Sequence, residues 1–278
     1  MKLSDFAYNR FSQFGEDGII EKIFEVIGVE SRVCIEFGAW DGLHLSNTAN
    51  LWKNGWEGIL IEADSQKYEL LLENTAGSKC HCIHQMVGVA GDHTLERILR
   101  SHQLDSDVDF LSIDIDGDDY HVFASVESLE PRVICCEYNP TIPAHIDLVP
   151  ETGNYFGCSV SSLVKLAESK GYYLIALTET NCFFVPKSEL PKFSGFVTAL
   201  EDMLIVDHIT YVMTGYNGDY VFSRKPTYGH RKPTEQAFRG EYYTPVADSI
   251  PNRSVPSLRF VVSALLRKAG LKSSRKSR

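Results

Sequence analysis

Residues 33–42 read VCIEFGAWDG, a short apolar run followed by a loop that holds Gly38 and Gly42. An apolar run that ends in glycine is typical of a buried strand that turns toward a helix. Glycine at such a turn lets the backbone pass close to a ligand, because there is no Cβ to collide with it. The spacing G-x-x-x-G differs from the G-x-G-x-x-G of dinucleotide-binding loops, which disfavours NAD.

Similar apolar runs recur along the chain and alternate with segments of helical periodicity. We expect strands at 32–37, 58–61, 81–89, 110–115, 132–137, 172–177 and 182–185, and helices at 19–27, 65–72, 94–102, 119–128 and 159–169. This alternation predicts an α/β fold with a mostly parallel sheet of seven strands. The last two strands are separated only by residues 178–181, too few for a helical crossover, so we expect them to pair antiparallel.

The charges divide the chain into an acidic body and a basic tail. Residues 223–278 hold 13 Lys and Arg against three acids, whereas the whole chain has a net charge of −10. We expect a first domain at 1–215 and an extension at 216–278, with an amphipathic basic helix near 257–269. That helix would dock on the body or a second subunit, or lie on an anionic membrane surface. The acidic body would repel a phosphate backbone, which argues against nucleic acid as a partner.

The cysteines and the N-terminus favour a cytoplasmic protein. Seven cysteines are an odd count, and five of them lie in apolar, strand-like runs, where free Cys behaves as a small hydrophobe. No apolar run is long enough to span a membrane, and the first residues lack the pattern of a signal peptide. The stretch CHCIH at 80–84 does not predict a zinc site, because alternate residues of a strand point to opposite faces.

An acid closes the second expected strand as well as the first. Glu62 follows Glu36 by 26 residues, in the next strand and helix unit. A carboxylate at this point can accept both hydroxyls of a ribose. Together with the acids around the first loop, it predicts a site for a nucleoside without phosphates and with a cationic end. The alternative is that Glu62 is a solvated acid at a strand end.

Oxygen ligands follow the fourth and fifth strands, whose carboxyl ends meet at one edge of a parallel sheet. They are Asp114, Asp116, Asp118 and Asp119 after the fourth strand, and Glu137 and Asn139 at the end of the fifth. Mg²⁺ prefers carboxylate and amide oxygens, so we expect a divalent cation held by Asp114, Glu137 and Asn139. In the alternatives, Asp118 and Asp119 only begin the next helix at its positive end, or Asp114 or Asp116 orients the substrate without a metal.

Five segments resemble the motifs of FkbM-type S-adenosylmethionine-dependent methyltransferases. They are SQFGED at 12–17, VCIEFGAWDG with SNT at 33–48, GWEGILIE at 55–62, DFLSIDIDGDDY at 109–120 and EYN at 137–139. The resemblance covers about residues 12–185 and implies a Rossmann-like class I methyltransferase fold. In that fold the sheet has the order 3-2-1-4-5-7-6, with strand 7 antiparallel and helices on both faces.

The same resemblance implies S-adenosylmethionine as the cofactor and assigns its contacts. Glu36, Gly38, Ala39 and Gly42 would line the methionine part, Glu62 the ribose, and Gly88 and Val89 the adenine, with Asp41, Ala63 and Asp114 completing the cofactor site. A narrower likeness concerns DIDGDDY at 114–120, which is similar to DADKDNY of the metal-dependent caffeoyl-CoA and macrocin-type O-methyltransferases. It implies metal contacts at Asp114 and Asn139, although Gly117 replaces the Lys and EYN replaces an adjacent Asp-Asn pair.

These features predict transfer of a methyl group to a hydroxyl. The sulfonium makes the methyl electrophilic, so the enzyme must place the acceptor in line and take up its proton. A cation would lower the pKa of the hydroxyl. Asp114 and Asp116 are candidate catalytic residues, and the candidate bases are His121, His145 and His44. The acceptor would be a saccharide or a small molecule, and the enzyme could form homo-oligomers. The alternative is a non-catalytic nucleoside-binding or assembly protein that retains the fold.

Overall fold

A seven-stranded sheet organises the first of two units of the chain, Met1–Val206 and Asp207–Arg278. The computed structural model describes residues 1–104, 107–216, 220–224 and 226–228. The amphipathic helix expected near 257–269 lies outside the described residues. None of the helices in the described part of the chain combines the length and the hydropathy that crossing a membrane requires.

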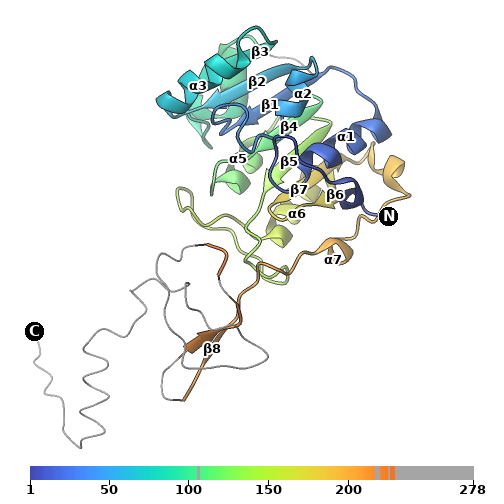
Figure 1. The fold of residues 1–278 in the computed structure, drawn as a ribbon, viewed down its shortest axis with the longest axis vertical. Coiled ribbons are helices and arrows are strands. Elements are labelled where there is room, and N and C mark those ends of the chain that lie inside the picture. The colour runs from blue at the N-terminus through green and yellow to red at the C-terminus, as the bar shows by residue number, and fades with distance from the viewer. Residues whose placement is uncertain (105–106, 217–219, 225, 229–278) are drawn as a thin grey trace, which may run out of the picture. The chain divides into compact units, whose positions relative to one another are not determined.

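The strand order of the sheet is β3-β2-β1-β4-β5-β7-β6, and Figure 1 shows the strands in this sequence. The strands are β1 (Val33–Phe37), β2 (Glu57–Glu62), β3 (Cys80–His84), β4 (Phe110–Ile113), β5 (Val133–Glu137), β6 (Tyr172–Leu177) and β7 (Asn181–Pro186). Strand β7 is antiparallel to β5 and β6, and the other pairs are parallel. The expected fold class and strand order are confirmed.

Helices cover both faces of this sheet. They are α1 (Glu16–Ile27), α2 (Ala49–Lys53), α3 (Ser65–Thr75), α4 (Leu95–Ser101), α5 (Asp119–Ser125), α6 (Val160–Ser169) and α7 (Leu200–Met203), with 3₁₀ turns η1 (Leu3–Phe6), η2 (Gly91–His93) and η3 (Leu190–Phe193). One apolar core joins the sheet to α1, α2 and α3, and the other joins it to α4, α5, α6 and α7. The sequence did not predict α2 and α7, which are too short to show helical periodicity.

The sequence prediction is wrong for the end of the third strand, which stops at His84 and not at residue 89. The chain turns there, and the backbone N–H of Gly88 donates to the carbonyl of His93 at 2.7 Å. In the second unit, the structure adds an antiparallel pair that the sequence did not predict, β8 (Val212–Thr214) and β9 (Tyr220–Phe222).

The sheet register places polar residues in rows at its carboxyl edge. Glu36 on β1 lies opposite Ser112 on β4, and Glu137 on β5 lies opposite Asn181 on β7. The neighbours of Glu36 along β1, Ile35 and Phe37, point into the core that contains α4 to α7. Because side chains alternate along a strand, Glu36 points to the α1 and α2 side.

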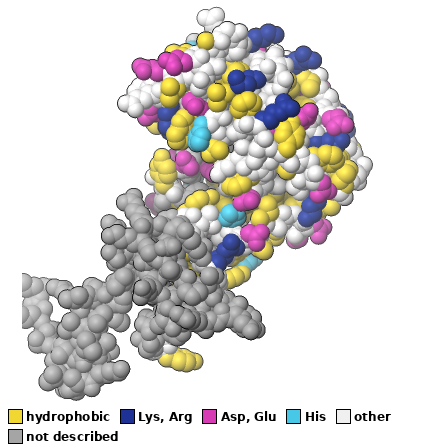
Figure 2. Space-filling view, viewed as in Figure 1, with side chains coloured by type: hydrophobic (Ala, Val, Ile, Leu, Met, Phe, Trp, Pro, Cys, Tyr) yellow, Lys and Arg dark blue, Asp and Glu magenta, His cyan; other side chains and the backbone are white. Residues whose placement is uncertain are grey.

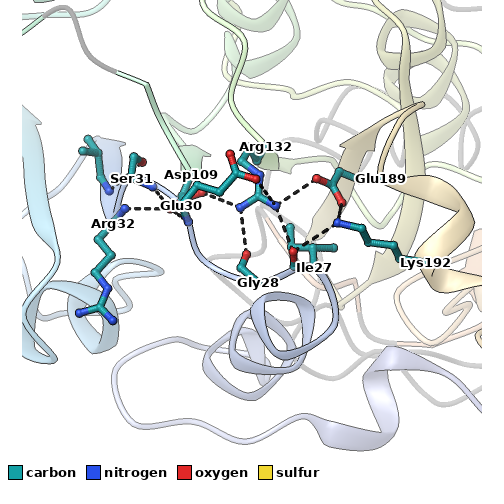
Figure 3. A network of polar contacts seen from close by, with 10 residues as sticks. Ile27, Gly28, Glu30, Ser31, Arg32, Asp109, Arg132, Glu189 and Lys192 are labelled. Carbon is teal, nitrogen blue, oxygen red and sulfur yellow. Dashed lines mark hydrogen bonds and ion pairs between the residues drawn. The ribbon is translucent and has the colours of Figure 1, made fainter.

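A network of polar contacts closes the opposite, amino edge of the sheet (Figure 3). The carboxylate of Asp109, which is fully buried, accepts hydrogen bonds from the backbone N–H groups of Glu30, Ser31 and Arg32 at 2.8–3.0 Å. Its other oxygen accepts from Arg132 at 2.9 Å. The guanidinium of Arg132 also donates to the carbonyls of Ile27 and Gly28 and to Glu189. The network therefore ties α1, β1, β4 and β5 together where their chains enter the sheet.

We predict that Asp109→Ala destabilises the protein by about 3–5 kcal/mol, because it removes one partner of a buried ion pair and leaves three N–H groups without an acceptor. Denaturation in urea measures the free energy of unfolding. Asp92→Ala is the matched control, since Asp92 pairs with Arg97 while its side chain is 92% exposed, and it should cost less than about 1 kcal/mol. Equal costs for the two variants would contradict a structural role for the network.

Candidate functional site

A cavity of about 460 Å³ opens at the carboxyl edge of the sheet, a size typical of small-molecule sites. Its walls come from the loops that follow β1 to β5 and from the segment before α1. The lining residues are Gln13, Glu36, Gly38, Ala39, Trp40, His44, Leu45, Ser46, Ile61, Glu62, Ala63, Lys67, Gln85, Met86, Val87, Asp114, Ile115, Asp116, Gly117, Asp118, Glu137, Gly153, Asn154 and Tyr155. The structure therefore brings residues of all five segments quoted for the resemblance to one place.

The first loop passes directly beside the tip of β4. Gly38 has φ +71°, and a Cβ added to it would lie 2.2 Å from the carbonyl oxygen of Asp114. The next residue, Ala39, donates its N–H to the carbonyl of Ile61 on β2 at 3.1 Å. The loop is thus held between β2 and β4, and only glycine fits at position 38.

Glu36 has a buried carboxylate that holds a neighbouring loop in place. One of its oxygens accepts from the hydroxyls of Ser46 and Thr48, both at 2.6 Å, and the other accepts from the N–H of Asn47 at 2.8 Å. Burial raises the pKa of Glu36, while these donors act in the opposite direction. The side chain therefore anchors the SNT segment at the wall of the cavity.

Glu62 at the end of β2 is only 7% exposed and lines the cavity. One oxygen accepts from the N–H of Trp40, and the other accepts from the N–H of Asp64, both at 2.8 Å. A carboxylate has about four lone-pair positions, so Glu62 retains acceptor capacity for a ligand. Its position supports the role that the sequence predicts for it.

Three of the five non-glycine residues with a positive φ in the described part of the chain line the cavity. Trp40, Leu45 and Asp116 have φ values of +51°, +56° and +58°, in the left-handed region that disfavours residues with a side chain. Such conformations cost roughly 1–3 kcal/mol each and persist where the surrounding structure enforces them. At Trp40 the bond from its N–H to Glu62 contributes to that enforcement.

Two predicted cofactor contacts, Asp41 and Gly42, do not line the cavity. The carboxylate of Asp41 accepts from the N–H groups of Leu43 and His44 at 2.9 and 2.7 Å and so closes a local turn. Gly42 has φ +80°, and a Cβ there would lie 2.7 Å from the side chain of Leu71 on α3. Both residues shape the first loop and pack it against α3.

Gly88 and Val89, predicted beside the adenine, do not line the cavity either. Because β3 ends at His84, the residues that reach the cavity from this segment are Gln85, Met86 and Val87. The prediction was displaced along the chain by the overestimated length of the strand.

Three carboxyl groups converge at the ends of β4 and β5. Oxygen atoms of Asp114, Asp119 and Glu137 lie within 4.8 Å of one another. Burial, followed by mutual repulsion, raises the pKa of Asp114 and of Glu137, and burial is the main cause of the raised pKa of Asp119. Asp119 also accepts from the N–H groups of Ile115 and Gly117 at 2.8 and 2.9 Å, which fixes it at the start of α5. Three clustered oxygen ligands fit a divalent cation.

Asn139, the third metal ligand in the sequence prediction, is occupied elsewhere. Its amide N–H donates to the carbonyl of Phe156 at 2.6 Å, and its oxygen accepts from the N–H and the hydroxyl of Thr141 at 2.9 and 2.6 Å. Asn139 therefore organises the segment between β5 and α6. The third member of the cluster with Asp114 and Glu137 is Asp119.

Of the three candidate bases, only His44 lines the cavity. Its ring lies 5.0 Å from that of Trp40. A ring nitrogen of His121 lies 2.7 Å from the carbonyl of Pro150, and His145 lines a different cavity of about 510 Å³ near α6 and α7. Asp116, the other candidate acid, lines the cavity with Asp114.

Several lining residues were missed from the sequence. Gln13 lies within a quoted motif but was given no role, and Trp40 was quoted only as part of the first loop. Lys67, in the first turns of α3, places its ammonium group 3.6 Å from the centre of the Trp40 ring. Tyr155 is 86% exposed, and the φ values of Gly153 and Gly157, +79° and +70°, mark turns on either side of it. A glycine on each side of an aromatic residue was the available signal for this loop.

No family model matches the chain, and no curated protein matches it in sequence. Among solved structures, it is similar to the CurJ carbon methyltransferase, with 13% identity and a TM-score of 0.41 over 61% of this chain and 52% of that one. It is also similar to the glycopeptide N-methyltransferase MtfA complexed with sinefungin, with 15% identity and a TM-score of 0.37 over 64% and 88%. A third is precorrin-6y C5,15-methyltransferase from Geobacter metallireducens, with 12% identity and a TM-score of 0.38 over 64% and 90%.

These neighbours are methyltransferases, and the match spans about half the length of the CurJ chain.

We predict that Glu137→Gln flattens the pH dependence of stability in the absence of divalent cations. An unfolded glutamate titrates near 4.5, whereas the folded protein raises the pKa of Glu137. The wild-type free energy of unfolding should therefore fall as the pH rises above that value, by at most about 1.4 kcal/mol per pH unit, and the variant lacks this contribution. Urea titrations from about pH 5 to about pH 8 with a chelator present measure the slopes.

Glu151→Gln, at an exposed position before α6, is the control and should leave the slope unchanged. Parallel curves for wild type and Glu137→Gln would show that the carboxyl cluster does not hold a proton more tightly than the unfolded chain.

Proposed function

We propose that this chain is an S-adenosylmethionine-dependent methyltransferase of the FkbM type that acts on a hydroxyl group. The observation that carries the proposal is the cavity itself, in which a glycine loop at β1, a carboxylate at the tip of β2 and further acids at β4 and β5 face one space. Six carboxylates among its lining residues favour a ligand with positive charge. The sulfonium and ammonium groups of S-adenosylmethionine meet that requirement, whereas a nucleotide phosphate does not.

The cofactor would lie along the strand tips in the order of the sheet. Met86 and Val87, which follow β3, and Ala63, which follows β2, offer apolar contacts to an adenine ring. Glu62 on β2 would accept hydrogen bonds from the ribose hydroxyls. Glu36 on β1 and Gly38 directly after β1 would flank the methionine part. This assignment keeps the predicted roles of Glu62 and Gly38 and moves the adenine contacts from residues 88 and 89 to residues 86 and 87.

A divalent cation would be held by Asp114, Asp119 and Glu137. This set differs from the contacts at Asp114 and Asn139 that the likeness to metal-dependent O-methyltransferases implies. When bound, such a cation lowers the pKa of a coordinated hydroxyl and offsets the repulsion among the three acids. Asp119 keeps its backbone partners at residues 115 and 117, so it would hold the acidic loop in place as well as the cation.

The acceptor would enter over the exposed side chains at the mouth of the cavity. Trp40, Leu45, Met86 and Tyr155 are 43%, 44%, 62% and 86% exposed and line it. Apolar and aromatic surfaces of this kind suit a small molecule or a saccharide ring, and the choice of a saccharide follows the habits of the FkbM type. His44 is the candidate base for the acceptor proton.

The remaining expectations about partners and location belong to the same proposal. On the visible face of the described residues, Lys and Arg side chains are interspersed with acidic and apolar ones, which does not favour nucleic acid (Figure 2). The seven cysteines are unpaired, in keeping with a reducing, cytoplasmic location. Association into homo-oligomers and contact of the basic tail with a membrane or a subunit stay predictions from the sequence.

We predict that Glu62→Ala weakens binding of S-adenosylhomocysteine by roughly 10-fold to 100-fold, because hydrogen bonds from the ribose hydroxyls to a charged acceptor are lost. Isothermal titration calorimetry measures the dissociation constant. Glu73→Ala, at an exposed position of α3, should bind as wild type does. Unchanged affinity in Glu62→Ala would remove this residue from the ribose site, and no binding to the wild type would remove the cofactor itself.

A separate prediction concerns the metal ligands. Asp119→Asn should weaken Mg²⁺ binding by at least about 10-fold, because it removes one of three charged ligands, whereas Asn139→Ala should leave Mg²⁺ affinity unchanged. Calorimetry of Mg²⁺ binding to each variant, with thermal melts as a check on folding, distinguishes the two ligand sets. The reverse result would restore the set predicted from the sequence, and a wild type that binds no Mg²⁺ would favour the metal-independent alternative.

A further inference from the structure

Side-chain hydrogen bonds fix the segment before α1. One oxygen of Asp17 accepts from the N–H groups of Arg10, Phe11 and Ser12 at 2.7–2.9 Å and from the hydroxyl of Ser12 at 2.8 Å. Asn9 donates its side-chain N–H to the carbonyl of Gln13 at 2.8 Å. The backbone on both sides of residue 13 is therefore held by hydrogen bonds.

Glu16 attaches this loop to the sheet. Its side chain is fully buried, and one oxygen accepts from the N–H of Phe14 at 2.7 Å. The other accepts from the hydroxyl of Thr178 at 2.7 Å and from the amide of Asn181 at 3.2 Å. Asn181 lies opposite Glu137 in the pairing of β5 and β7. The loop is thus fixed at the β5 and β7 side of the cavity.

Gln13 is the residue that this fixed loop presents to the cavity. Its carbonyl takes part in the loop, while its side-chain amide makes no hydrogen bond to the described part of the chain. The amide therefore offers two N–H donors and an acceptor that the loop does not use.

The charges around the cavity indicate which ligand group needs such a donor. Six of the lining residues are acids, and the single lysine or arginine among them, Lys67, comes from α3 and lies against the Trp40 ring. A carboxylate on a ligand would be repelled by the acids. An N–H donor on the side of the cavity away from β2 and β3 would offset that repulsion, and the loop of Gln13 is attached on this side.

We propose that the side-chain amide of Gln13 binds the α-carboxylate of the cofactor, an inference that rests on the proposed function. With the adenine at β3 and the ribose at β2, the amino-acid end points along the sheet toward β4 and β5, and so toward the loop anchored by Glu16. The ammonium group would then meet Glu36 and Asp114, while the carboxylate meets Gln13. The SQFGED motif would thus form one wall of the cofactor site and hold Gln13 in position.

The test compares two probes, S-adenosylhomocysteine and its decarboxylated analogue, which keeps the amine. Gln13→Ala should weaken the binding of S-adenosylhomocysteine by about 10-fold or more, because a hydrogen bond to a charged group is lost. It should change the affinity for the analogue by less than about 2-fold. Gln13→Glu, which has nearly the same shape, should show a larger difference between the probes because it adds repulsion. Calorimetry gives each dissociation constant, and thermal melts confirm that the variants fold.

Gln66→Ala is the matched control, since Gln66 lies on the exposed side of α3 and outside the cavity, and it should bind both probes as wild type does. If the wild type binds both probes and Gln13→Ala affects them equally or not at all, the role of Gln13 is wrong while the proposed cofactor stands. If the wild type binds neither probe, the proposed function fails, and the inference fails with it.

Discussion

The candidate site depends on how closely β1 and β4 approach each other at their carboxyl ends. A Cβ on Gly38 would lie 2.2 Å from the carbonyl oxygen of Asp114. The first loop can therefore pass beside β4 only if residue 38 is glycine. Because the neighbouring strands are in register, the same row continues to Glu137 on β5 and to Asn181 on β7. Acids from separate parts of the sequence are thereby placed around one cavity.

The fold was largely predictable because its signals are local. Buried strands appear as short apolar runs, and the three residues between β6 and β7 exclude a crossover, which determines the antiparallel end of the sheet. The error at the third strand comes from a turn that the apolar pattern does not reveal. Residues 85–89 are partly apolar and extend the pattern, but the bond between Gly88 and His93 turns the chain away from the sheet. The short helices α2 and α7 contain too few residues for a periodic pattern.

The site residues also fall into those that a local sequence pattern reveals and those that depend on contacts elsewhere in the chain. The places of Glu62 and Gly38 at the cavity were predictable because they follow from position at a strand end, which the sequence pattern reveals. The partners that Asn139 has in the structure, Thr141 and the carbonyl of Phe156, could not be predicted because they depend on how the next loop folds. Gln13 was missed because its loop reaches the cavity through the bond between Glu16 and Thr178, which are 162 residues apart. Such a contact leaves no pattern in a single sequence.

The buried acids at the two edges of the sheet differ in whether the protein itself compensates their charge. At the amino edge, Asp109 is matched by Arg132 and three N–H groups, so its charge is compensated within the protein. At the carboxyl edge, Asp114 and Glu137 face each other and Asp119 without a nearby cation from the lining residues, and their raised pKa values express that conflict. Buried acids without a partner destabilise a fold unless a ligand compensates them. A cationic cofactor and a divalent cation would supply that compensation.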